Sequence, residues 1–141
     1  MSMELKEKIK VDLKRRNFTP NTVLNTIKNS FSGIKFYAMD GKSILIYLLG
    51  VVVEIVLGIV YKINGLEWIL IVCILGIILS VELLNTAIES TCDAITKEFN
   101  SYIKIAKDCG SAATFVIFIV SIILNIIIFF PKVMAVLGIW W

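Results

Sequence analysis

The sequence of 141 residues contains no histidine, so neither proton transfer nor metal binding can rely on imidazole. Its three cysteines, Cys73, Cys92 and Cys109, form no CxxC pair and have no metal-site spacing. They lie in or beside apolar segments, which favours small hydrophobic residues over a disulfide framework. Charged residues make up only 18% of the chain, and the formal net charge of +3 is too small to indicate nucleic-acid binding. Acid–base chemistry must therefore use carboxylates or lysines.

Apolar residues, in contrast, are abundant. The hydrophobic fraction is 58% and the mean hydropathy is +0.89, both above the values of ordinary soluble domains. A single domain of this length cannot bury so much apolar surface, because small domains leave a large share of their surface exposed. The composition predicts a protein that lies in lipid, with a large oligomer as the alternative.

Three apolar runs have the length of membrane spans. They cover residues 43–61, 66–88 and 110–130, and the last is halted at Pro131. At about 1.5 Å per residue, even the shortest run is about 28 Å long as a helix, within the usual range for crossing a hydrocarbon core of roughly 30 Å. The sequence therefore predicts an all-α integral membrane protein, a single domain over 1–141 with three transmembrane helices.

Residues 1–42 are polar to amphipathic and do not have the pattern of a cleaved signal peptide. Lysines and arginines crowd the N-terminus, which indicates either contact with an anionic membrane surface or a solvated basic tail. After Thr19 and Pro20, a typical helix start, apolar residues recur at spacings of three and four. We predict an amphipathic helix at the membrane interface; packing on a soluble partner would give the same pattern.

The distribution of basic residues predicts the orientation. Most lysines and arginines lie in the N-terminal arm and in the mixed, charged segment 89–108, whereas the turn after the first span and the C-terminus each hold one. Because basic residues stay on the cytoplasmic side, the N-terminus and 89–108 are expected in the cytoplasm and the C-terminus outside. The expected location is a cell membrane.

A polar stripe follows the second span. On a helix with about 100° per residue, Glu82, Asn85, Glu89 and Asp93 fall within roughly 80° of one another. Ionisable groups at membrane depth are costly and usually functional. A solvated helix end would also show these acids, although Glu82 has only Val81, Leu83 and Leu84 around it in sequence.

Before the third span, Lys107 and Asp108 precede the small residues 110–113. Small residues let helices approach closely in lipid, which is the structural interpretation. The functional interpretation is that Lys107 faces an anionic ligand held over the carboxylate stripe, since carboxylates, a divalent metal and a lysine are typical of phosphoryl transfer. The tripeptide 41–43, Gly-Lys-Ser, resembles the end of a P-loop, but the leading glycine position is Phe36 and no strand is predicted before it.

The two motifs together carry a family resemblance. The run ELLNTAIES–CDAI at 82–95, followed by AKDCGSAA at 106–113, resembles the prokaryotic diacylglycerol kinase family, which includes the undecaprenol kinases of Gram-positive bacteria. The similarity covers about residues 22–132. It implies a homotrimer that uses ATP and Mg²⁺ to phosphorylate the primary hydroxyl of a membrane lipid. Undecaprenol is the first expected acceptor and diacylglycerol the second; a non-catalytic lipid- or nucleotide-binding relative is the alternative from another class.

The resemblance also implies roles for single residues. Glu82 matches the general base that takes the proton of the lipid hydroxyl, and Asn85 is a polar residue beside that base. Glu89 matches a ligand of the Mg²⁺ that accompanies ATP, and Lys107 matches a phosphate contact. Nucleotide-binding positions are implied at Glu89, Asp93, Glu98, Asn100, Lys107 and Asp108.

Two features depart from the family pattern. The family carries a second metal-binding glutamate on the surface helix, eight residues after the glycine that matches Gly33, and Gly41 occupies that position here. The neighbouring Asp40, about 100° round a helix, is the expected substitute ligand. Glu54 lies well inside the first span, where it is either protonated, paired within the bundle or engaged with a polar lipid head.

Overall fold

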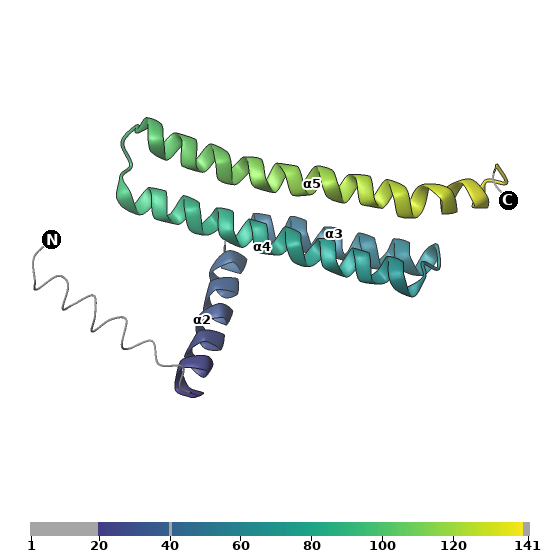
Figure 1. Cartoon of the computed structure of the whole chain (residues 1–141), viewed down its shortest axis with the longest axis horizontal. Coiled ribbons are helices and arrows are strands. Elements are labelled where there is room, and N and C mark those ends of the chain that lie inside the picture. The colour runs from purple at the N-terminus through teal and green to yellow at the C-terminus, as the bar shows by residue number, and fades with distance from the viewer. Residues whose placement is uncertain (1–19, 40, 140–141) are drawn as a thin grey trace, which may run out of the picture. The chain divides into compact units, whose positions relative to one another are not determined.

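The computed structural model describes residues 20–39 and 41–139, whose regular structure is entirely α-helical (Figure 1). Three of the helices in these ranges are long and apolar enough to cross a membrane, namely α3, α4 and α5. The predicted all-helical fold with three apolar spans is confirmed at this level. The elements are α2 (Pro20–Met39), α3 (Lys42–Val60), α4 (Gly65–Ile95) and α5 (Ser101–Val136).

The chain divides into two compact units, residues 1–36 and 37–141. Of the first unit, the structure describes only the part in α2, which begins at Pro20, where the missing N–H leaves no intrahelical bond unmade. The basic N-terminal arm and Asp40 lie outside the described residues. The predicted location of α2 at a membrane interface stays a prediction.

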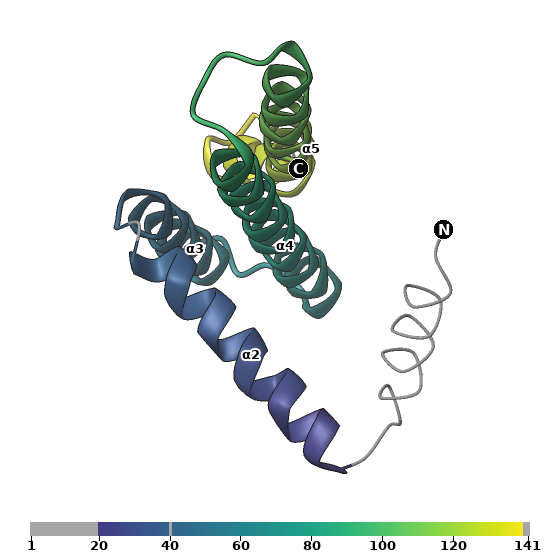
Figure 2. The same cartoon turned by 90° about the vertical axis from the view of Figure 1, so that its left-hand side faces the viewer.

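In the second unit, α4 lies between α3 and α5 (Figure 2). It packs against both neighbours, whereas no Cα atoms of α3 and α5 approach within 8 Å in the described residues. The core cluster consists of Ile63, Ile71, Ile128 and Phe129. Most other large apolar side chains point outward, which suits a lipid environment and would be unfavourable over so wide an area in water.

A network of polar contacts fixes the end of the bundle where α3 turns into α4. Asn64 Oδ1 accepts hydrogen bonds from the backbone N–H groups of Leu66 and Glu67, both at 3.0 Å, and Glu67 Oε2 accepts from Asn64 N–H at 2.7 Å. This reciprocal capping box satisfies N–H groups that a helix start leaves unpaired. Lys132 of α5 reaches the same Glu67 carboxylate at 3.0 Å, so one acid joins the start of α4 to the end of α5.

Helix α5 continues through Pro131 to Val136, beyond the point where the third apolar run was predicted to stop. Proline removes its own N–H from the helix ladder and its ring crowds the carbonyl group four residues earlier, but helices in membranes tolerate proline where neighbouring groups compensate. Here Lys132 binds Glu67 directly after the proline. Helix α4 continues past the predicted span 66–88 to Ile95, in agreement with the helical stripe predicted through Asp93, so the segment 89–108 consists of two helix ends around a short connection.

Candidate active site

The polar stripe lies on a single uninterrupted helix. Asn85 Nδ2 donates to Glu89 Oε1 at 3.1 Å, so their spacing of four residues places them on one face of α4, as the sequence predicts. Glu82 lies one turn earlier and is partly buried, whereas Glu89 is exposed. One helix face therefore presents a carboxylate close to the apolar part of the bundle and another about 10 Å further along its axis.

The end of the stripe connects to α5 through an ion pair. Lys107 Nζ donates to Asp93 Oδ1, which joins the last turns of α4 to the second turn of α5. Both side chains are well exposed, at 37% for Lys107 and 60% for Asp93, so the pair adds little stability. Its effect is to hold the ammonium group of Lys107 over the end of α4.

The neighbouring acid and base have a different arrangement. Lys104 Nζ lies 2.8 Å from Asp108 Oδ2, within the same helix and one turn apart. Lys104 and Lys107 are thus two exposed lysines with distinct partners, one within α5 and one across to α4. This difference provides a matched pair for testing which lysine contacts a ligand.

A polar cavity of about 610 Å³ lies where α4 ends and α5 begins. This volume falls in the range of small-molecule sites. Of the six predicted nucleotide-binding positions, all except Glu89 line the cavity: Asp93, Glu98, Asn100, Lys107 and Asp108. Lys97 and Lys104 add two further cations to its wall, so the cavity offers ammonium groups to an anionic ligand.

Asn100 has a structural task at the cavity. Its Oδ1 accepts hydrogen bonds from the backbone N–H groups of Tyr102 at 2.9 Å and Ile103 at 3.3 Å, so it caps the start of α5. Glu98 N–H donates to Thr96 Oγ1 at 3.0 Å and shapes the same connection. The sequence analysis did not detect the cap, although an asparagine just before a helical run is a known signal for one.

Gly110 of α5 is buried against Asn85 of α4. A Cβ atom built on Gly110 would overlap with Asn85 Oδ1, a buried oxygen without a hydrogen-bond partner in the described part of the chain. For this residue the structural interpretation of the small-residue run is confirmed, because its lack of a side chain permits the approach. Ser111, Ala112 and Ala113 are exposed and play no such part.

We expect Gly110→Ala to destabilise the protein by about 1–3 kcal/mol, because the added methyl group displaces Asn85 and its bond to Glu89. Gly76→Ala is the matched control, since Gly76 lies inside α4 with no atom within 4 Å of an added Cβ. The control gains helix propensity and should be neutral or stabilised by up to about 1 kcal/mol. Unfolding of both variants in mixed micelles measures the difference, and equal stabilities would contradict the contact.

The sequence analysis predicted two metal ligands, Glu89 and Asp40. Among residues 20–39 and 41–139, no three Asp, Glu or Cys side chains converge as a metal site, and Asp40 is outside these ranges. The exposed Glu89 carboxylate nevertheless fits Mg²⁺, which is usually bound by one or two carboxylates together with substrate phosphates. Glu89 would hold the ion jointly with a nucleotide, without a protein cage.

The segment around Gly41 does not form a phosphate-binding loop. Lys42 and Ser43 open α3, and helix α2, not a strand, precedes them in the chain. Gly41 has φ 71°, a left-handed conformation that a glutamate would adopt only with strain. The backbone here therefore differs from what a metal-binding glutamate at this position would favour.

Glu54 has a partner that the sequence analysis missed. The side chain is buried, and its Oε1 accepts a hydrogen bond of 2.8 Å from Asn125 Nδ2 of α5. Pairing within the bundle, one of the predicted alternatives, is therefore correct for one carboxyl oxygen. An amide in the middle of the third apolar run was the available signal, because polar side chains inside spans usually bind one another.

Comparison with known proteins defines the class. Residues 28–129 match the family described as prokaryotic diacylglycerol kinase, and the chain belongs to this family of small membrane kinases. The resemblance found in the two sequence motifs is confirmed.

Two relatives make the comparison more specific. Undecaprenol kinase of Bacillus subtilis is 38% identical over 78 residues, which cover 55% of this chain and 63% of the relative. Diacylglycerol kinase of Pseudomonas aeruginosa is 56% identical over 45 residues, 32% of this chain and 35% of the relative. The chain thus spans less than two thirds of the length of either relative that it matches.

Proposed function

We propose that the protein is an ATP- and Mg²⁺-dependent lipid kinase that phosphorylates the primary hydroxyl of undecaprenol at the cytoplasmic face of a bacterial membrane. The observation that carries this proposal is the polar stripe of α4, which starts partly buried at Glu82 and leads to a cavity with three lysines. Family membership and the names of the two relatives support it. Diacylglycerol is the alternative acceptor.

Glu82 is the proposed general base. Its carboxylate takes the proton of the lipid hydroxyl while the hydroxyl oxygen bonds to the γ-phosphorus of ATP and the bond to the ADP oxygen breaks. Its partly buried position beside apolar residues suits a substrate that reaches the site from the membrane. Asn85, directly beside it on the helix face, binds Glu89 and keeps that carboxylate oriented.

The nucleotide is proposed to occupy the polar cavity, with Lys107 on a phosphate group. The cavity residues Asp93, Glu98, Asn100 and Asp108 would shape the rest of this site, and Glu89 would hold the metal at its edge. Mg²⁺, when bound with ATP, supplies neutralisation of phosphate charge. Phosphoryl transfer needs mainly positioning and charge stabilisation, which fixed side chains on two helices provide.

Assembly and orientation complete the proposal. A homotrimer with composite sites is expected, and the wide apolar surface exposed along α3, α4 and α5 supports it, because other copies would cover part of that surface. The basic residues place the N-terminus and the 89–108 segment in the cytoplasm and the C-terminus outside.

The test is phosphate transfer from radiolabelled ATP to undecaprenol and to diacylglycerol in mixed micelles, with and without Mg²⁺. We expect Mg²⁺-dependent labelling of both lipids, with undecaprenol preferred. Preference for diacylglycerol would favour the alternative acceptor. No transfer to either lipid from folded protein would contradict the kinase. ATP binding without transfer would favour a non-catalytic relative, to which the glycine at position 41 also points.

A further inference from the structure

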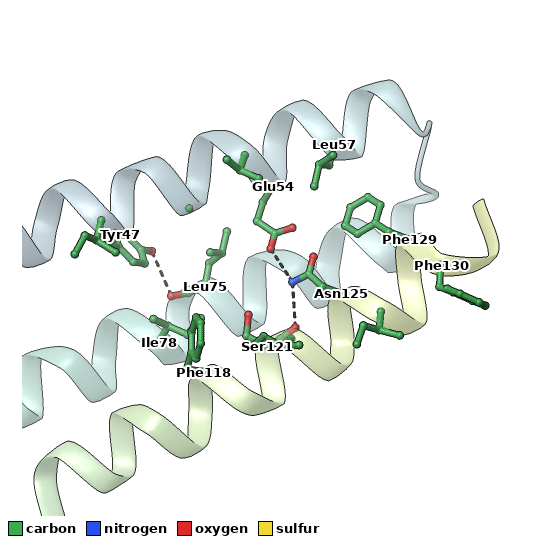
Figure 3. A pocket seen from close by; sticks show the side chains of 15 residues that line it. Tyr47, Glu54, Leu57, Leu75, Ile78, Phe118, Ser121, Asn125, Phe129 and Phe130 are labelled. Atoms are coloured by element: carbon green, nitrogen blue, oxygen red, sulfur yellow. Dashed lines mark hydrogen bonds between the residues drawn. The ribbon is translucent and has the colours of Figure 1, made fainter. Parts of the chain in front are cut away.

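A second cavity, of about 650 Å³, lies in the apolar part of the bundle between α3 and α5, with α4 behind it. It exists because α3 and α5 each pack on α4 without approaching each other. Figure 3 shows Glu54 reaching from α3 and Asn125 from α5 across this gap. We refer to it as the lateral groove; its walls include Ile46, Val53, Leu57, Ile122, Ile126 and Phe129.

The lateral groove and the polar cavity share no lining residue. One end of the groove lies near the proposed base, because Ile78 of α4 lines it and precedes Glu82 by four residues, or about 6 Å along the helix. Leu75, further along the α4 side of the groove, precedes Glu82 by seven residues, or about 10 Å. Tyr47, whose hydroxyl donates to the Leu75 carbonyl at 3.2 Å, borders the groove at that level, and Glu54 lies two turns further along α3. The proposed phosphoryl transfer uses none of these groups.

One carboxyl oxygen of Glu54, in the lateral groove, has no hydrogen-bond partner among the described residues. The residue is only 9% exposed, and while Oε1 binds Asn125, Oε2 is buried without a partner in the described residues. Asn125 Nδ2 also donates to the Ser121 carbonyl at 3.0 Å, which holds the amide in place. A buried, unpaired carboxyl oxygen costs free energy, and a ligand that binds it would remove that cost.

The surroundings limit what this ligand can be. Water fills polar cavities and needs two to four partners per molecule, whereas the walls here are mostly apolar. A helix of a second chain, about 10–12 Å wide, could enter only by breaking the Glu54–Asn125 bridge that crosses the gap. A single alkyl or isoprenoid chain is thin enough to lie beside the bridge, and the apolar rim of the groove is exposed on spans that we expect to lie in lipid.

The chemistry of the carboxyl group selects the polar end of the ligand. A hydroxyl donates one hydrogen bond and accepts two, so it pairs with Oε2 whether Glu54 is ionised or protonated. An ammonium group, which only donates, would suit the ionised carboxylate alone, and either an ammonium or a phosphate group would bring charge into an apolar groove. We propose that the lateral groove is a second binding site for a neutral long-chain lipid alcohol, with its hydroxyl on Glu54 and its chain along the apolar walls.

This site would hold the hydroxyl of the alcohol within the membrane, away from the Glu82 end of α4. The choice of ligand class rests on the proposed function, whose acceptor is also a lipid alcohol. The groove itself, its volume and the unpaired oxygen stand on the structure alone.

The experiment is photolabelling of the full chain in mixed micelles by a long-chain primary alcohol that carries a diazirine in its chain. Unlabelled alcohol competes, and labelled peptides are identified by mass spectrometry. We expect labels on α3 and α5 residues of the groove. Glu54→Leu should weaken binding about tenfold, whereas Glu54→Gln, which keeps a donor and an acceptor, should stay within about twofold. The corresponding alkane should compete about tenfold less well than the alcohol.

Equal labelling in the Glu54→Leu variant, equal competition by the alkane, or labels confined to other surfaces would overturn the site. Cross-linking between two copies of the Ile122→Cys variant would also overturn the site if the alcohol did not prevent it, because a second chain would then occupy the groove. The readout requires no phosphate transfer. If the protein showed no kinase activity but was still labelled in the groove, the proposed function would be rejected and the second binding site would be supported.

Discussion

Replacing Glu82 with glutamine is expected to lower the rate of phosphate transfer to a lipid alcohol by about 10²–10⁴-fold, the usual contribution of a general base. Glutamine has nearly the same shape but cannot accept the hydroxyl proton. Because Glu82 does not line the polar cavity, the KM for ATP should remain within about twofold. Initial rates in mixed micelles, over a range of ATP concentrations, measure both quantities.

The matched control is Glu67→Gln, on the same helix. Glu67 caps the start of α4 and binds Lys132, and glutamine retains much of the capping ability. Its transfer rate should stay within about twofold of the unmodified protein, because Glu67 precedes Glu82 by 15 residues, or about 22 Å along α4. If both substitutions reduced the rate equally, the loss would reflect helix stability, and Glu82 would not be the base.

The second large effect is expected from Lys107→Met. Removal of a cation that contacts a transferring phosphate typically costs about 10²–10³-fold in rate, and methionine keeps the length of the side chain without its charge. Lys107 lines the polar cavity and is held over the end of α4 by Asp93. We therefore expect a fall in kcat/KM for ATP of this size, measured by the same transfer assay.

Lys104→Met is the control for this prediction. Lys104 lines the same cavity, lies on the same helix and also forms an exposed ion pair, but its partner is Asp108 on its own helix. Its loss should change kcat/KM for ATP by about threefold or less, since exposed pairs of this kind contribute little. Equal losses in the two variants would indicate that the lysines of the cavity contribute equally to ATP binding and would contradict a specific contact by Lys107.

The features predicted correctly from the sequence depend on local periodicity. The helix repeat alone places Asn85 and Glu89 on one face, and the structure joins them by a hydrogen bond. The three apolar spans likewise follow from the length of each run. Neither inference requires knowledge of how the helices pack.

The features missed by the sequence analysis depend on tertiary contacts. Glu54 and Asn125 lie 71 positions apart, and only the packing of α3 and α5 on either side of α4 brings them together. The end of α5 was placed at Pro131 because proline usually ends a helix, yet the contact between Lys132 and Glu67 supports the next turn. Asp40 and the basic arm remain predictions outside the described residues.

The length of α4 has a consequence for the membrane around the protein. Its 31 residues extend about 46 Å, well beyond a hydrocarbon core of about 30 Å, and Glu82 lies about 26 Å from its start. We expect Trp68 and the Glu67–Lys132 pair to lie at one membrane interface, and a hydrophobic mismatch would then be absorbed at the other end of the helix. A thicker bilayer would draw Glu82 towards hydrocarbon and a thinner one would expose it to water, so bilayer thickness would control the environment of the proposed base.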